Sequence, residues 1–233
     1  MKHRRTSLPL ALEHRLNTHA LAASAAGVGL LALAQPAEAK IVFTPVHQKL
    51  PINQDFYIDL NHDGTNDFSF RAGHGGQGHD TFVVSTYANL FAFPPQGNGV
   101  VGKTYGSALS RGASIGPNSP LVNRQSVGMG GYATLDGQGG YWGPWANGGQ
   151  GVQHRYLGLE FLISGKVHFG WARFNVRVFY DNRARVDAVL TGYAYETVPN
   201  KPIIAGKTKG PDDRQGSLGR RRGGDSELER MRM

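Results

Sequence analysis

The clearest hydrophobic pattern in the chain lies between residues 156 and 196, where apolar side chains recur at every second position. Alternation with period two is typical of β-strands, because successive side chains of a strand point to opposite faces of the sheet. Two turn sequences, Ser164-Gly165 and Asp181-Asn182-Arg183, interrupt the alternation. The pattern therefore predicts an antiparallel meander of three strands. We expect these strands at residues 156–163, 167–180 and 186–195.

Trp171 falls in the middle of the second strand of this meander, on the same face as Phe169 and Arg173. A large ring at such a position fits a sheet face that other elements cover. We therefore expect Trp171 to pack inside the fold rather than to contact a ligand.

Shorter strand signals occupy the N-terminal part of the chain, where aromatic and β-branched residues gather in short runs. The runs are residues 41–44, 56–58, 68–70, 81–84 and 90–93. After Pro94 the composition changes, because sixteen glycines fall between Gly97 and Gly151 and no strong period is present. Such a stretch predicts either long loops with short strands or a partly mobile insertion.

These signals predict one all-β domain over residues 40–205, folded as an antiparallel β-sandwich of jelly-roll or lectin-like type. The domain would contain 166 residues, which is ample for a single hydrophobic core. The chain has no cysteine. Its core, a metal ion or both must therefore hold the fold without disulfides.

The first 39 residues have the layout of an export signal. Basic residues precede a small, apolar run at positions 20–34, and Ala37-Glu38-Ala39 offers a small-x-small cleavage sequence. An apolar run of 15 residues is too short to span a bilayer comfortably. We therefore expect a protein that is secreted or held at the extracellular surface, with the periplasm as the alternative. We expect no transmembrane segment after cleavage of the signal.

The net charge of +8 belongs partly to the two ends of the chain, because residues 40–205 carry only +3. Residues 206–233 are strongly charged and contain few apolar side chains. This composition predicts a disordered basic tail. The high isoelectric point is therefore weak evidence for nucleic acid, which we do not expect as a partner.

One nine-residue stretch, residues 59–67, has the ligand spacing of a calcium loop. Oxygen-bearing side chains stand at relative positions 1, 3, 5 and 9, and Gly64 stands at position 6, where such a loop turns sharply. The carbonyl at position 7 would supply a further ligand. The expected ligands are the side chains of Asp59, Asn61, Asp63 and Asp67 and the carbonyl of Thr65.

The flanks of this loop are strand-like, and Phe70 stands where an EF-hand would have its bidentate glutamate. The nine residues resemble the aspartate-rich loops of dockerin, thrombospondin type 3 and related extracellular calcium repeats, in a single copy. The alternative is a long hairpin turn in which Asp and Asn side chains bond to the backbone without a metal. Three carboxylates within nine residues repel one another unless a cation lies among them, so we favour one bound Ca²⁺.

Tyr141, Trp142 and Trp145 stand among glycines and asparagines. Exposed rings can stack on the faces of sugars, whereas buried rings would pin a glycine-rich loop to the sheet. Pinning is the more common use of such rings, and carbohydrate binding is the alternative.

No arrangement of catalytic residues stands out along the chain. Residues 112–116 match the hydrolase pattern G-x-S-x-G, but Pro117 and Pro120 follow where that chemistry needs a helix. A glycosidase needs two facing carboxylates, and Glu160 and Asp187 on neighbouring predicted strands could face each other. A surface ion pair with a neighbouring arginine is the more common use of either carboxylate.

Two C-terminal runs carry a resemblance to a known group. They are residues 168–174, His-Phe-Gly-Trp-Ala-Arg-Phe, and residues 191–197, Thr-Gly-Tyr-Ala-Tyr-Glu-Thr. Together with the loop they resemble a group of uncharacterised secreted bacterial β-proteins, many of which carry a D-x-N-x-D-G-x-x-D loop. The resemblance implies export and a β-sandwich, and it implies no known activity.

Many members of that group end in a PEP-CTERM-type sorting tail, and this chain departs from the pattern. It has no Pro-Glu-Pro motif and no terminal apolar helix. A shift of reading frame near Leu218 would explain the change of composition, and a genuine basic tail is the alternative.

These observations favour a secreted or cell-surface structural or interaction protein, stabilised by one calcium ion and without catalytic activity. A carbohydrate-binding module, with a polysaccharide or cell-surface polymer as its partner, is the first alternative. A glycosidase on a lectin-like sandwich is the second.

Overall fold

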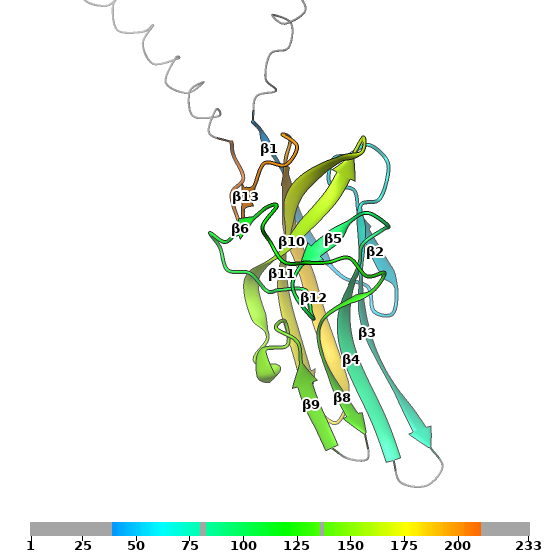
Figure 1. Ribbon diagram of the computed structural model, residues 1–233. Helices are drawn as coiled ribbons and strands as arrows, with labels where there is room; N and C mark the ends of the chain where they lie inside the picture. Colours follow the sequence, from blue (N-terminus) through cyan, green and yellow to red (C-terminus); the bar gives the residue numbers. More distant parts are fainter. Residues whose placement is uncertain (1–38, 80–82, 136–137, 211–233) are drawn as a thin grey trace, which may run out of the picture. The chain divides into compact units, whose positions relative to one another are not determined.

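The computed structural model describes residues 39–79, 83–135 and 138–210, which form two packed antiparallel sheets (Figure 1). The larger sheet contains, in spatial order, β1 (Ile41–Lys49), β12 (Ala184–Glu196), β11 (Lys166–Tyr180), β10 (Val152–Ile163), β5 (Gly99–Val101) and β7 (Leu121–Val122). The smaller sheet contains β2 (Asp55–Ile58), β3 (Phe68–His79), β4 (Val83–Phe93), β8 (Val127–Leu135) and β9 (Gln138–Trp142). A ribbon of β6 (Ser114–Ile115) and β13 (Ile203–Ile204) and a 3-10 helix, η1 (Asn147–Gly149), complete the described elements. The expected all-β antiparallel sandwich is confirmed.

The predicted meander is present as β10, β11 and β12, which are hydrogen-bonded neighbours in the six-stranded sheet. Its turns fall at residues 164–165 and 181–183, as the sequence indicates. The first strand of the chain, β1, pairs with the late strand β12, and Ile41 lies opposite Glu196. Figure 1 shows β1 and β13 at the same end of the sandwich.

The main core lies between the two sheets, and both of them contribute to it. Phe70 of β3 and Phe174 of β11 meet there with ring centroids 5.0 Å apart, in an edge-to-face arrangement. Burial of such large apolar side chains is the dominant favourable term in folding. The face of β11 that carries Ala172, Phe174 and Val176 is therefore the inner face of its sheet.

A second core covers the opposite face of the six-stranded sheet. Trp171 is fully buried there, between the rings of Phe43 (5.7 Å) and Tyr156 (5.2 Å). The ribbon supplies Ile115 and Ile203 to the same cluster. The prediction that Trp171 is a packing residue is confirmed.

The glycine-rich segments contain more strand than the sequence predicts. The run after Arg71 continues as β3 to His79. One strand, β4, contains residues 83–84 of the run expected at 81–84 and all of the run expected at 90–93, whereas residues 81–82 lie outside the described residues. A nine-residue strand, β8, lies inside the region expected to be mostly loop. A strand rich in glycine shows no hydrophobic alternation, because glycine has no side chain. The sheet face at each glycine is covered instead by side chains of neighbouring strands.

The expected export signal lies outside the described residues except for Ala39, and the tail lies outside them beyond Gly210. In the ranges that the structure describes, no helix is both long and apolar enough to cross a membrane.

Candidate functional site

The aspartate-rich loop, residues 59–67, joins β2 to β3 as the tip of a hairpin. Ile58 and Phe68 are paired at its base. Leu60 points back into the main core and is only 1% exposed. His62 (φ 60°) and Gly64 (φ 87°) turn the chain through left-handed conformations, which glycine adopts without steric cost. The loop is thus tied to the core by its second residue.

The carboxylate of Asp59 organises the first half of the loop. Its Oδ1 accepts hydrogen bonds from the backbone amides of His62 (2.6 Å) and Asp63 (3.3 Å). Its Oδ2 accepts a hydrogen bond from the amide of Gly64 (2.8 Å). Bonds of this kind hold a tight turn in place, with or without a cation.

Asp63 and Asn61 occupy the centre of the loop. Asp63 Oδ1 accepts a hydrogen bond from the amide of Thr65, and Oδ2 accepts one from Asn61 Nδ2, both at 2.8 Å. These bonds, that from Asn61 first, hold the pKa of Asp63 below its usual value. The remaining polar atom, Asn61 Oδ1, is buried and has no hydrogen-bond partner in the described part of the chain. A buried oxygen without a partner costs free energy, so it calls for a cation or a water.

Asp67 is the most buried acid of the loop, with 7% of its surface exposed. Its Oδ2 accepts a hydrogen bond from the amide of Leu60 (2.7 Å). Burial, with a smaller contribution from the charges of Asp59 and Asp63, raises the pKa of Asp67 from 3.8 to about 6. The ionised form of Asp67 is therefore unfavourable in the absence of a cation.

Two contacts fasten the loop to the six-stranded sheet. His62 Nε2 lies 2.9 Å from the hydroxyl oxygen of Thr44 on β1. Asn98 donates from Nδ2 to the carbonyl of Asp67 (2.9 Å) and accepts at Oδ1 from the amide of Leu162 on β10 (3.2 Å). Ordering this loop therefore affects its contacts with the six-stranded sheet.

The structure places the expected ligands in one loop, but the carboxylates do not converge on one point. Within residues 39–79, 83–135 and 138–210, no three His, Cys, Asp or Glu side chains form a group that could hold a metal ion. The donor set nevertheless fits calcium in kind, since carboxylate, amide and backbone oxygens are its usual ligands. The unpartnered Asn61 oxygen fits one of those positions. A plain hairpin turn accounts equally for the bonds of Asp59.

The three aromatic residues considered for carbohydrate binding lie in three different places. Trp145 is fully buried, and its Nε1 donates to the carbonyl of Gly106 (2.8 Å), so it is a packing residue. Tyr141 packs on Tyr132 with ring centroids 4.7 Å apart. Trp142 is its neighbour in β9 and points to the other face of the sheet. Of these three residues, Trp142 is the one that lies on the outer face of the five-stranded sheet.

The two carboxylates considered for a glycosidase are far apart, so the expectation that they could face each other is wrong. Glu160 is paired with Phe169 of β11, whereas Asp187 is paired with Arg177. At about 3.3 Å per residue along β11, the two positions are separated by roughly 26 Å. Glycosidase pairs lie within about 10 Å of each other. Asp187 instead forms an ion pair with Lys49 Nζ (2.7 Å).

Sequence reasoning missed the surroundings of Trp142. Phe91 and Tyr105 pack against its indole, with ring centroids 5.9 and 5.6 Å away. Arg124 and these three rings line one depression of the surface. Recognising residues 83–93 as one strand would have placed Phe91 on the outer face, because Leu90 and Ala92 then face the core. The position of Tyr105, in a long loop, has no comparable signal in the sequence.

Comparison with known protein families, with curated proteins and with solved structures finds no match to this chain.

Proposed function

We propose that this chain is a secreted or cell-surface structural and interaction protein, and that one Ca²⁺ bound in residues 59–67 stabilises its sandwich. The observation that carries the calcium part is the buried Asn61 Oδ1, which lacks a partner in the described residues. It lies in a loop that also holds the buried carboxyl of Asp67, whose pKa is raised to about 6. Both groups gain from a nearby cation.

The side chains of Asp59, Asn61, Asp63 and Asp67 and the carbonyl of Thr65 would hold the ion. Bound calcium would supply positive charge and no chemistry beyond it, so the role is structural. Because Leu60 reaches the core and His62 reaches β1, residues ordered around an ion would strengthen the packing of the hairpin on the six-stranded sheet. An exported protein without cysteines has a use for such a clamp.

The role in binding rather than catalysis is supported by the position of the acids. Asp187 is engaged with Lys49, and Glu196 is engaged with Lys201 Nζ (3.4 Å). Glu160, whose pKa is raised by burial, lies far along the sheet from Asp187.

Thermal unfolding of the full chain in chelator and in 10 mM calcium tests the calcium clamp. Extracellular modules often bind calcium with a Kd of about 0.1 to 1 mM. A ligand specific to the folded state then adds about 1.4 to 2.7 kcal/mol. This gain raises the melting temperature by roughly 3 to 10 °C.

Two variants make the experiment specific. Asp63→Ala should abolish the rise caused by calcium while leaving the chain folded, because Asp63 is exposed. Asp181→Ala is the matched control, since Asp181 is also an exposed turn carboxylate but lies in the β11–β12 turn. It should keep the full rise. Identical melting curves of the parent chain with and without calcium would reject the clamp.

A further inference from the structure

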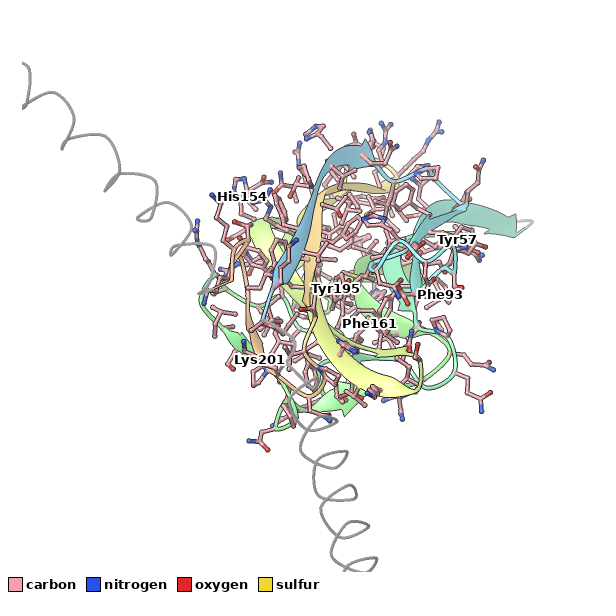
Figure 2. The ribbon with its side chains drawn as sticks, turned by 90° about the horizontal axis from the view of Figure 1, so that it is seen from above. Tyr57, Phe93, His154, Phe161, Tyr195 and Lys201 are labelled. Atoms are coloured by element: carbon pink, nitrogen blue, oxygen red, sulfur yellow. The ribbon has the colours of Figure 1, made fainter. Side chains whose placement is uncertain are left out.

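The outer face of the five-stranded sheet carries a row of aromatic and amide side chains. On β4, Ala88, Leu90 and Ala92 are fully buried, so the intervening residues point outward. The outward residues are Tyr87, Asn89, Phe91 and Phe93. Tyr57 of β2 lies on the same face and is 55% exposed. Figure 2 shows Tyr57 and Phe93 on the side of the molecule where the cyan strands lie.

Glycines beneath this row keep the surface flat. A Cβ on Gly128 of β8 would stand 3.0 Å from the indole of Trp142 and 3.3 Å from the ring of Tyr105. A Cβ on Gly73 would stand 2.8 Å from the amide oxygen of Asn89. The side chains therefore lie down on the glycines of neighbouring strands. The result is a platform whose rings present their faces and edges to solvent.

Two depressions follow one another along this platform. One, of about 380 Å³, is lined by Arg71, Asn89 and Phe91, among others. The next, of about 370 Å³, is lined by Tyr105, Arg124 and Trp142, among others. Both are lined by Phe91 and Ser126, so the two depressions adjoin, and together they are called the groove below. Each depression has the size of a small-ligand site.

Several polar groups of the groove have no bonding partner within the described chain. They are the amide of Asn89, the hydroxyls of Thr104 and Ser126, and the guanidinium of Arg124. Arg71, by contrast, is held by Asp55 through two hydrogen bonds (2.8 and 2.7 Å) and lies over the ring of Phe93. No acidic residue lines either depression. The groove thus offers flat rings, free amide and hydroxyl groups, and one cation without a counter-ion.

We propose that this groove binds an acidic polysaccharide, with pyranose rings on Trp142 and its aromatic neighbours and a uronic carboxylate on Arg124. The C–H faces of a pyranose fit partly exposed rings, and its hydroxyls fit the free side chains of Asn89 and Ser126. A guanidinium binds a carboxylate through two parallel hydrogen bonds. The charge of the groove therefore selects an anionic chain over a neutral one.

This inference names a partner for the proposed interaction protein, and it uses no residue of the calcium loop. The full chain is titrated with an oligogalacturonate and with a neutral hexasaccharide of glucose, each in calcium and in chelator. Poly-L-glutamate, which has carboxylates but no sugar rings, is the third probe. The oligogalacturonate should bind at least tenfold more tightly than either of the others.

Two pairs of variants locate the binding. Trp142→Ala should weaken binding of the oligogalacturonate at least tenfold, whereas Tyr141→Ala, on the other face of β9, should leave it unchanged. Arg124→Gln should weaken binding severalfold and reduce its salt dependence. Arg183→Gln is its matched control and should have no effect, because Arg183 is exposed in the β11–β12 turn and its side chain forms no bond within the described residues. The melting temperature of each variant shows whether it is folded.

Equal binding of poly-L-glutamate or of the glucose oligomer would overturn the proposal, as would no binding of oligogalacturonate. Unchanged binding by Arg124→Gln, a surface variant that need not disturb the fold, would also overturn it. If calcium does not raise the melting temperature of the parent chain and the chain still binds the oligogalacturonate, only the calcium clamp is rejected. The two proposals therefore fail separately.

Discussion

Replacing Asp67 by asparagine separates the charge of this residue from its shape. The side chain is 7% exposed and accepts a hydrogen bond from the amide of Leu60. An asparagine oxygen can accept the same bond, and the substitution removes the negative charge. Because burial and the charges of Asp59 and Asp63 raise the pKa of Asp67, the charge is unfavourable in the calcium-free protein.

The magnitude follows from the pKa values of the folded and unfolded states. An ordinary aspartate, as in the unfolded chain, has a pKa of 3.8, whereas the pKa of Asp67 in the folded chain is about 6. A difference of about 2 units corresponds to about 3 kcal/mol. Between these values the folded state binds more protons than the unfolded state, so stability falls as the pH rises. The contribution is complete below pH 3.8 and is lost above about pH 6.

Urea unfolding in chelator between pH 4 and pH 7 measures this effect. Other carboxylates change the stability of both proteins, so the difference between Asp67→Asn and the parent isolates Asp67. The variant should be more stable than the parent at pH 7, by at most about 3 kcal/mol, and the difference should vanish near pH 4. Calcium should stabilise the parent more than the variant, which lacks one charged ligand. A variant less stable than the parent at pH 7 in chelator would refute the reasoning.

Trp171→Ala should lower the free energy of unfolding by about 3 to 5 kcal/mol, because the ring is fully buried between Phe43 and Tyr156. Trp171→Phe should cost less than half as much in the same urea titration, since phenylalanine removes an indole N–H that lacks a partner in the described chain; equal losses would contradict this packing. Gly64→Ala should cost about 1 to 2 kcal/mol because of its φ of 87°. Gly140→Ala, with open space around it, should change stability by less than about 0.5 kcal/mol, and equal effects of the two substitutions would count against a strained loop.

The meander could be predicted because its side chains alternate. Leu157 and Leu159 face one side of β10, and the turn at Ser164 interrupts the pattern where the strand ends. Alternation is a direct consequence of a sheet that is covered on its inner face, so it survives in the sequence. The burial of Trp171 could be predicted from its position in the middle of a strand, but the second core that covers its face of the sheet could not.

The five-stranded sheet was harder to predict than the meander, because a glycine does not indicate which face of a strand is buried. Gly73 and Gly128 lie in strands, yet the side chains that cover them, Asn89 and Trp142, come from elsewhere in the chain. The groove exists only through strand pairing at long range. Its sequence signal is therefore a scatter of aromatic residues among glycines, which equally fits a loop.

The candidate loop could be located from its spacing, but its internal bonds could not. The order Asp59, Asn61, Asp63 places oxygens at alternate positions in a turn. A carboxylate oxygen can accept a hydrogen bond from an amide, as Asp63 does from Asn61. Whether it does so depends on backbone and side-chain angles that the spacing does not specify. The burial of Asp67 likewise depends on contacts with distant strands.

A crystal of the full chain grown in excess calcium provides the most direct test of the calcium clamp. Anomalous difference density at a long X-ray wavelength distinguishes calcium from water and shows where the ion lies. We expect one peak within the loop, 2.3 to 2.6 Å from oxygens that include Asn61 Oδ1 and the carboxylates of Asp59, Asp63 and Asp67. A well-ordered loop without such a peak, with the present hydrogen bonds retained, would contradict the account.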